Sequence, residues 1–195
     1  DIECLYFESP PHTSMEAKNK VLKLANILND YSGNIKVHVV PFTNIQETIY
    51  RFCPEDYMIT IMRRMMYRIA HKFAKMHKIP IIVNGESVGQ VASQTITSMS
   101  VINEVTNMPI IRPVACLDKL EIIEIAKKIG TYETSILPFE DCCTIFVPKH
   151  PVINPKLEKC VLAESKFNFD KMIDECIENI ETITNLEPNN YDDLL

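Results

Sequence analysis

Hydrophobic positions along the chain switch between the spacing of strands and the spacing of helices. Short apolar stretches predict strands over residues 2–7, 35–40, 79–83 and 108–114. The stretch at 79–83 is nearly continuous in apolar character, which is typical of a strand covered on both faces. Between the strands, apolar residues recur at helical spacing and predict helices over residues 13–32, 43–52, 57–77, 94–106 and 118–130.

Terminal signals support two of these helices. Thr13 and Asp118 each stand three residues before a glutamate, the spacing of a capping box at a helix N-terminus. Ser32 and Gly33 mark the end of the first helix, and Gly130 stands where a C-terminal cap is expected after the later one.

The order of elements indicates the fold class. Strands separated by helices of about ten or more residues imply right-handed βαβ units. We therefore predict an α/β fold, with a doubly wound parallel sheet and helices on both faces. Four prolines predict a long loop over residues 136–155, a final amphipathic helix is expected over 169–184, and the acidic residues 186–195 are expected to fray.

Composition excludes several classes of protein. Of the 195 residues, 46% are hydrophobic and 24% charged, and no apolar run approaches the ~20 residues of a membrane-spanning helix. The four glycines cannot build a Walker A loop or a G-x-G-x-x-G fingerprint. A net charge of −6 gives no overall reason to bind nucleic acid, although local basic patches are compatible with it. Seven cysteines without a C-x-x-C pair or a signal peptide predict reduced thiols in a cytoplasmic protein.

Candidate chemistry lies where the predicted strands end, because ligands of open parallel sheets gather at the carboxyl edge. The segments in question are 7–9, 42–43, 84–87 and 112–113. The third carries two of the four glycines, Gly85 and Gly89, around a glutamate and a serine. The same five residues also match the G-x-S-x-G elbow of serine hydrolases, in which Ser87 would be the nucleophile.

Two adjacent arginines lie in the methionine-rich helix predicted over residues 57–77. Helical spacing places Arg63 near the apolar side and Arg64 on the polar side. A guanidinium near the apolar side needs an acidic or phosphate partner. Both a phosphate ligand and a neighbouring carboxylate remain open for Arg63, and the methionines themselves could face a protein partner.

Adjacent thiols lie in the proline-bounded loop. Cys142 and Cys143 are candidates for nucleophiles or sulfur carriers, with two inert cysteines as the alternative. A zinc site that combines them with His150 and Cys160 is a further alternative, although its spacing is unusual.

Five segments together resemble one family of enzymes. The segments are M-R-R-M-M at 62–66, G-E-S-V-G-Q-V-A-S-Q-T at 85–95, I-I-R-P at 110–113, I-G-T-Y-E at 129–133 and E-D-C-C at 140–143. In this order they resemble the tRNA 4-thiouridine synthases, or tRNA sulfurtransferases, from the first strand to about residue 170.

The resemblance implies an adenine-nucleotide α-hydrolase-like fold of the PP-loop group and a specific reaction. Such enzymes use ATP with Mg²⁺ to adenylate uridine 8 of tRNA, and persulfide sulfur then displaces AMP to give 4-thiouridine. Matching motif to position implies ATP contacts for five residues, with no metal ligands assigned: Tyr6, Phe7, Arg63, Gly85 and Gln94. The acceptor cysteine falls on Cys142, with Cys143 as the neighbouring candidate.

The resemblance also implies partners and missing parts. The family's S-G-G-x-D-S phosphate loop and its RNA-binding THUMP region precede the matched region and are absent here, so we expect this chain alone to be inactive. Residues 1–163 would form the catalytic domain and 164–195 a C-terminal helix and acidic tail. Expected partners are tRNA, a cysteine desulfurase as sulfur donor and a second copy in a homodimer, and the family carries a link to thiamine biosynthesis. Another PP-loop enzyme and a non-enzymatic nucleotide-binding or dimerisation module remain alternatives.

Overall fold

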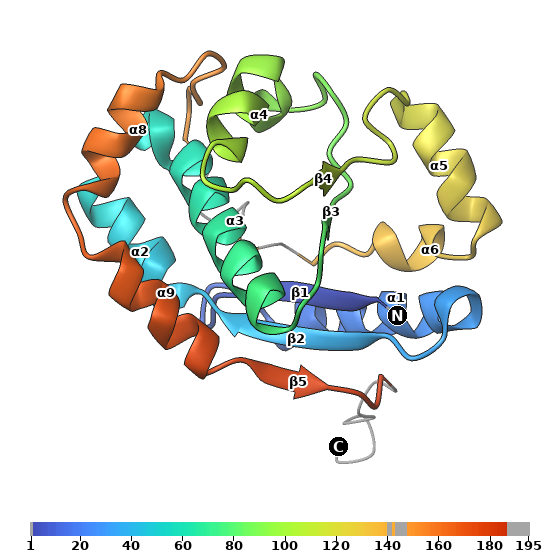
Figure 1. Ribbon diagram of the computed structural model, residues 1–195. Coiled ribbons are helices and arrows are strands. Elements are labelled where there is room, and N and C mark those ends of the chain that lie inside the picture. The colour runs from blue at the N-terminus through green and yellow to red at the C-terminus, as the bar shows by residue number, and fades with distance from the viewer. Residues whose placement is uncertain (1, 140–141, 143–147, 187–195) are drawn as a thin grey trace.

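The two longest strands have helices on both faces in the computed structural model, which describes residues 2–139, 142 and 148–186 (Figure 1). The strands are β1 (Glu3–Glu8), β2 (Lys36–Pro41), β3 (Ile82–Val83), β4 (Ile110–Ile111) and β5 (Glu181–Ile183). The helices are α1 (Met15–Ser32), α2 (Thr43–Phe52), α3 (Met58–Met76), α4 (Ile96–Asn103), α5 (Lys119–Lys128), α6 (Tyr132–Ser135), α8 (Leu157–Glu164) and α9 (Phe169–Glu178), with 3₁₀ turns η1 (Glu55–Tyr57) and η2 (Ala92–Gln94).

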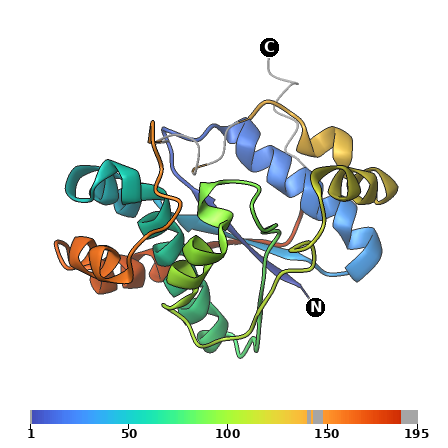
Figure 2. The same ribbon diagram turned by 90° about the horizontal axis from the view of Figure 1, so that it is seen from above.

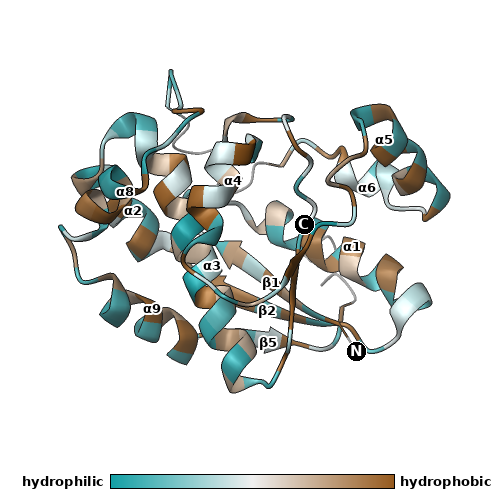
Figure 3. Ribbon diagram, turned by 45° about the horizontal axis from the view of Figure 1, so that its top comes forward, coloured by the Kyte–Doolittle hydropathy of each residue, from teal (hydrophilic) through white to brown (hydrophobic). Residues whose placement is uncertain are grey.

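The alternation of side chains along β1 and β2 explains why both faces of the first sheet are covered. The two strands run parallel, with Glu3 opposite Lys36 and Glu8 opposite Pro41. One face packs on α1 through a cluster of Tyr6, Leu22, Ala25, Ile35, Val37, Val39 and Leu186. The other face packs through Leu5, Phe7 and Val40 on α2, α3 and α9. Helices therefore lie on both sides of these strands, as the predicted α/β class requires (Figures 2 and 3).

Strand pairing differs from the single parallel sheet that the sequence predicts. The described strands form two sheets, ordered β1-β2-β5 and β3-β4, and β5 is antiparallel to β2. Val83 and Ile111 are 57% and 46% exposed, so the prediction that 79–83 is covered on both faces is wrong. The reason is that β3 pairs only with β4 among the described strands, and its other side opens on a cavity.

Helix ends show which local signals determined the structure. Asp118 forms the predicted capping box with Glu121, and Gly130 adopts a positive φ of 74° just after the helix. The first helix is capped by Ser14 rather than Thr13, because the Ser14 hydroxyl accepts from the amide of Ala17. The Thr13 hydroxyl instead accepts from the amide of Ser9.

The C-terminal region corrects two further predictions. The last helix ends at Glu178 rather than near residue 184, because Glu181–Ile183 pairs with β2. There the Thr182 hydroxyl lies 2.9 Å from Nδ1 of His38. Leu186 is buried against the first sheet rather than frayed. Helix α8 was not predicted.

The long helix α3 lies at the centre of the main core. Four of its methionines, Met58, Met62, Met65 and Met66, are buried and form core rather than a surface for a partner, whereas Met76 at its last position is 60% exposed. Arg64 is also buried, with a side-chain exposure of 1%. The prediction that Arg64 lies on the polar, solvent-facing side of the helix is therefore wrong. The helices α4 and α8 pack on the side of α3 that the helical spacing marks as polar, and Arg64 bonds there to Glu104, just after α4, and to Glu164, the last residue of α8.

Candidate functional site

A cavity of about 740 Å³ lies between β1, α3 and the segment around β3. Its lining is mostly apolar and comprises residues 2–7, Val21, Arg63, Met66, Tyr67, Ala70, Phe73, Ala74, Ile79, residues 81–84 and Cys142. An apolar cavity of this size with a few convergent polar groups is the usual form of a small-molecule site.

A buried carboxylate organises one side of this cavity. Arg63 on α3 forms an ion pair with Glu86, which follows β3 and has a side-chain exposure of 3%. Arg112, which follows β4, donates from Nε to the same carboxylate at 2.8 Å. Tyr67 and Asn84 each donate to its second oxygen at 3.0 Å. The parallel pairing of β3 and β4 brings these groups together, because both strands end at the same edge.

The charges around Glu86 fix the protonation of the cluster. Burial raises the pKa of Glu86, but the positive charges of Arg63 and Arg112 outweigh the burial, so the pKa of this carboxyl lies below its usual value. Burial, followed by the charge of Glu86, raises the pKa of Tyr67 to about 12. Near neutral pH, Glu86 is therefore charged and Tyr67 is a hydrogen-bond donor.

Cys142 lies on the same cavity and is 4% exposed. Gln46, a buried residue of α2, donates from Nε2 to the main-chain carbonyl of Cys142. Elsewhere in the described chain, burial raises the pKa of Cys53, Cys160 and Cys176 to about 11, as expected of thiols that stay protonated near neutral pH.

The structure brings together some of the residues that the sequence singles out. The cavity is lined by Tyr6, Phe7, Arg63 and Cys142. Cys143 lies outside the described residues. Gly85 is not among the described lining residues, and its φ is not positive.

Gln94 also lies away from the cavity lining. Its side-chain oxygen accepts from the amide of Ser87 at 3.3 Å, and its main-chain carbonyl accepts from Gly89 at 2.8 Å. Gln94 thus closes the loop that begins at Gly85. The assignment of both residues to nucleotide binding stays a prediction.

The two alternative chemistries gain no support from the geometry. Ser87 is buried and its hydroxyl donates to the main-chain carbonyl of Leu117 at 2.9 Å, so it is not the exposed nucleophile of a hydrolase elbow. Among the described residues, which leave out Cys143, no group of three or more His, Cys, Asp or Glu could hold a metal ion.

The same part of the chain contains no helix that is long and apolar enough to cross a membrane.

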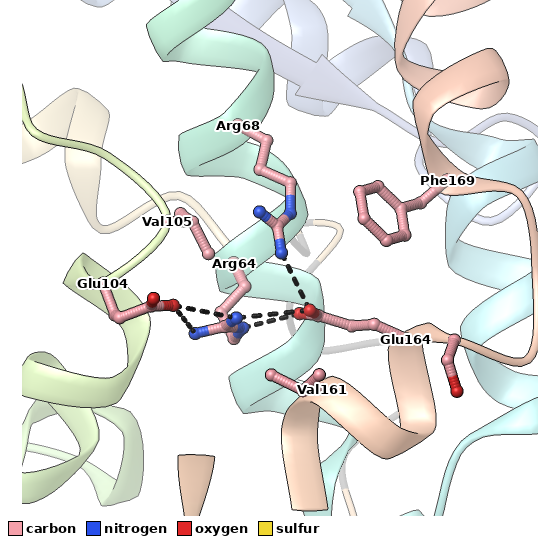
Figure 4. Close-up of a pocket in the computed structure, with 8 residues that line it drawn as sticks. Arg64, Arg68, Glu104, Val105, Val161, Glu164 and Phe169 are labelled. Carbon is pink, nitrogen blue, oxygen red and sulfur yellow. Dashed lines mark hydrogen bonds and ion pairs between the residues drawn. The ribbon is translucent and has the colours of Figure 1, made fainter. Parts of the chain in front are cut away.

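A second cavity, of about 370 Å³, lies where α3 meets α4, α8 and α9 (Figure 4). Glu164 accepts from Nε of Arg64 at 2.5 Å and from Nη2 of Arg68 at 2.8 Å. Glu104 lies 3.3 Å from the Arg64 guanidinium, and the Arg68 guanidinium stacks over the ring of Phe169. Two carboxylates balance two guanidinium groups here, which indicates a structural junction rather than an anion site.

Residues 1–169 match the family described as "Thiamine biosynthesis protein (ThiI)". The chain belongs to the ThiI family. Proteins called "Probable tRNA sulfurtransferase" are similar to this ThiI-family chain: one from Bacillus pumilus is 56% identical over 93% of the chain, and one from Oceanobacillus iheyensis is 54% identical over 93%. One from Macrococcus caseolyticus is 52% identical over 100% of the chain. The ThiI-family chain spans 45%, 46% and 49% of these relatives, about half of their length.

A solved structure resembles the ThiI-family chain closely. It is described as a 4-thiouridine synthetase–RNA complex with bound ATP, and it is 36% identical to the chain, with a TM-score of 0.88. The match covers 93% of this chain and 48% of the solved one. This structural match confirms the predicted PP-loop fold class.

Sequence reasoning assigned no individual role to four polar residues of this ThiI-family site, although the second and third lie in the candidate segments 84–87 and 112–113: Tyr67, Glu86, Arg112 and Gln46. The need of Arg63 for an acidic partner was the available signal for Glu86, and of the two partners left open for Arg63 the structure shows the carboxylate. Arg112 lies in a segment expected at the carboxyl edge of the sheet. Tyr67 and Gln46 gave no signal, because each lies in a helix whose orientation depends on tertiary packing.

Proposed function

We propose that this chain is the catalytic region of an ATP-dependent tRNA sulfurtransferase that adenylates uridine 8 and replaces its oxygen with persulfide sulfur, giving 4-thiouridine. The observation that carries the proposal is that one cavity is lined both by a cationic side chain suited to phosphate, Arg63, and by a cysteine, Cys142. Nucleotide activation and sulfur transfer would then share one site. The relatives named for this activity support the proposal.

The cavity suits a nucleotide in size and chemistry. Its volume of about 740 Å³ lies in the range of small-molecule sites, and its apolar walls can cover a base and a ribose. Arg63 offers a planar guanidinium to phosphate oxygens. Tyr6 and Phe7, at the end of β1, complete the predicted contacts.

We propose that Mg²⁺ binds mainly through the phosphates of ATP and through water, rather than through a set of protein side chains. The carboxylate beside the cavity, Glu86, is already paired with two arginines, and the described residues contain no cluster of metal-ligating side chains. Mg²⁺ usually keeps several waters and binds through substrate phosphates with one or two carboxylates. We therefore assign Mg²⁺ to the phosphates of the ATP.

Cys142 is our choice for the sulfur acceptor, with Cys143 as its neighbour. The terminal sulfur of a cysteine persulfide would attack C4 of the adenylated uridine, and the C–O bond would break as AMP leaves. A second thiol would then attack the remaining S–S bond, which releases 4-thiouridine and leaves the two thiols joined in a disulfide. Gln46 donates to the main-chain carbonyl of Cys142, which ties the backbone at this residue to α2 beside the cavity.

We further propose the partners that the sulfur chemistry requires. A cysteine desulfurase would supply the persulfide, and tRNA would be the acceptor. A homodimer, a cytoplasmic location and a link to thiamine biosynthesis belong to the same proposal. The division into a catalytic domain at 1–163 and a C-terminal part at 164–195 is also proposed, with the qualification that β5 of the second part extends the first sheet.

Transfer of labelled sulfur tests the function directly. The full-length protein that carries this chain is incubated with labelled cysteine, a cysteine desulfurase and tRNA, with and without ATP. We expect ATP-dependent label in 4-thiouridine, and no label with the variant Cys142→Ser. Turnover of ATP without label in tRNA would refute the proposed substrate and favour another PP-loop enzyme that activates a different carbonyl.

A further inference from the structure

Three polar side chains on one wall of the cavity share a partner that does not itself line the cavity. Arg63, Tyr67 and Asn84 all line it, and all three are hydrogen-bonded to Glu86. Arg63 and Tyr67 lie one turn apart on α3, whereas Asn84 follows β3. One carboxylate thus determines where groups from two different elements point.

Glu86 is itself held in place from several directions. Its amide donates to the side-chain oxygen of Asn84 at 3.1 Å, which fixes the turn after β3. Arg112 donates to its carboxylate at 2.8 Å and to the side-chain oxygen of Asn103 at 3.0 Å. The carboxylate has a side-chain exposure of only 3%, so little solvent competes for these bonds.

Two guanidinium groups, those of Arg63 and Arg112, both form ion pairs with the carboxylate of Glu86. Arg63 is the member of this pair that lines the cavity. A cation that is held by buried bonds before a ligand arrives loses little freedom on binding, which favours an anionic ligand.

We propose that Glu86 is a positioning residue, which fixes Arg63 on the cavity wall for the phosphate groups of the nucleotide. This inference rests on the proposed function, since it assigns ATP to the cavity. Arg112 helps to hold Glu86, because it donates to the same carboxylate at 2.8 Å. Glu86 acts through Arg63 and does not itself touch the nucleotide.

A purely structural role of Glu86 makes a different prediction. If the carboxylate only ties α3 to the β3 and β4 segments, its loss lowers stability and affects every ligand of the cavity alike. If it positions Arg63 for phosphate, its loss weakens the binding of ATP and leaves the binding of adenosine, which has no phosphate, unchanged.

Calorimetric titration of the full-length protein with ATP and with adenosine separates these roles. The variants are Glu86→Gln, which removes the charge, and Arg112→Met, which removes the supporting guanidinium outside the lining. Glu104→Gln is the matched control, because Glu104 also pairs with an arginine of α3 but belongs to the second cavity. All titrations are made well below the melting temperature of each variant.

For Glu86→Gln we expect ATP to bind about tenfold more weakly, the scale of one charge-assisted hydrogen bond, with adenosine unchanged. Arg112→Met should show a smaller loss in the same direction, and Glu104→Gln no loss for either ligand. Wild-type affinity for ATP in Glu86→Gln, or an equal loss for ATP and adenosine, would overturn the positioning role. If Glu86→Gln does not fold, Arg112→Met decides by the same comparison.

The outcome for the wild-type protein keeps the two proposals apart. A wild-type protein that binds ATP but transfers no sulfur to tRNA would overturn the proposed function, while the comparison of variants still decides the role of Glu86. A wild-type protein that binds no ATP would overturn both.

Discussion

Replacing Arg63 by methionine and replacing its neighbour Arg64 by methionine should impair two different properties of the protein, ligand binding and stability. Methionine keeps an unbranched chain of similar length, so each variant removes mainly the charge and its hydrogen bonds. Arg63 lines the large cavity and is 23% exposed at its side chain, whereas Arg64 is 1% exposed and bonded to Glu164 and to the carbonyl of Val101. We expect Arg63→Met to impair nucleotide binding and Arg64→Met to impair stability.

The magnitude for Arg64 follows from the groups that the variant leaves behind. Breaking a buried ion pair costs about 3–5 kcal/mol. Glu164 keeps its bond to Arg68 at 2.8 Å, which places Arg64→Met at the lower end, about 3 kcal/mol. In a domain of this size that corresponds to a melting temperature lower by about 6–12 °C. In Arg63→Met, Glu86 keeps Arg112, so we expect a loss of only about 1 kcal/mol.

Two measurements on the full-length protein test this contrast. Thermal unfolding should show the larger decrease for Arg64→Met. ATP titration at a low temperature should show binding at least about tenfold weaker for Arg63→Met and near the wild-type value for Arg64→Met. Equal melting temperatures, or equal losses of ATP affinity, would refute the division of roles between the two arginines.

Three further outcomes follow from other contacts. Cys142→Ser should abolish sulfur transfer but still form adenylated tRNA, and loss of AMP formation in that variant would indicate a structural cysteine instead. Gln46→Leu removes the donor to the Cys142 carbonyl and should slow sulfur transfer about tenfold while ATP affinity is unchanged, as measured in single-turnover assays; an unchanged rate would contradict this role. The lowered pKa of Glu86 means that its contribution to stability is complete above the ordinary glutamate pKa of about 4.3 and is lost as the pH falls through the lower folded value. Acid unfolding curves should therefore show a smaller loss of stability between neutral and acidic pH for Glu86→Gln than for the wild type, and parallel curves would exclude the linkage.

Local signals in the sequence determined much of the secondary structure. The helix at Thr43–Phe52 has its predicted bounds, and the capping box at Asp118 and the glycine at 130 act where the pattern places them. Such signals act within a few residues, through hydrogen bonds and backbone conformations that do not depend on the rest of the fold. The alternation of strands and helices fixed the α/β class for a similar reason, since few topologies bury such elements.

Tertiary packing alone decided the environment of individual side chains. Helical spacing placed Arg64 on a polar face, but α4 and α8 cover that face and bury it. The motif around Gly85 drew attention to residues 84–87, yet only the pairing of β3 with β4 brings Arg112 to Glu86 and so creates the cluster beside Arg63. Periodicity reports which side of an element is apolar, but it does not report what another element, distant in sequence, places against that side. The charges of this site are paired across separations of 23 and 26 residues, which is why the sequence by itself predicted that Arg63 needs an acidic or phosphate partner but not that Glu86 is that partner.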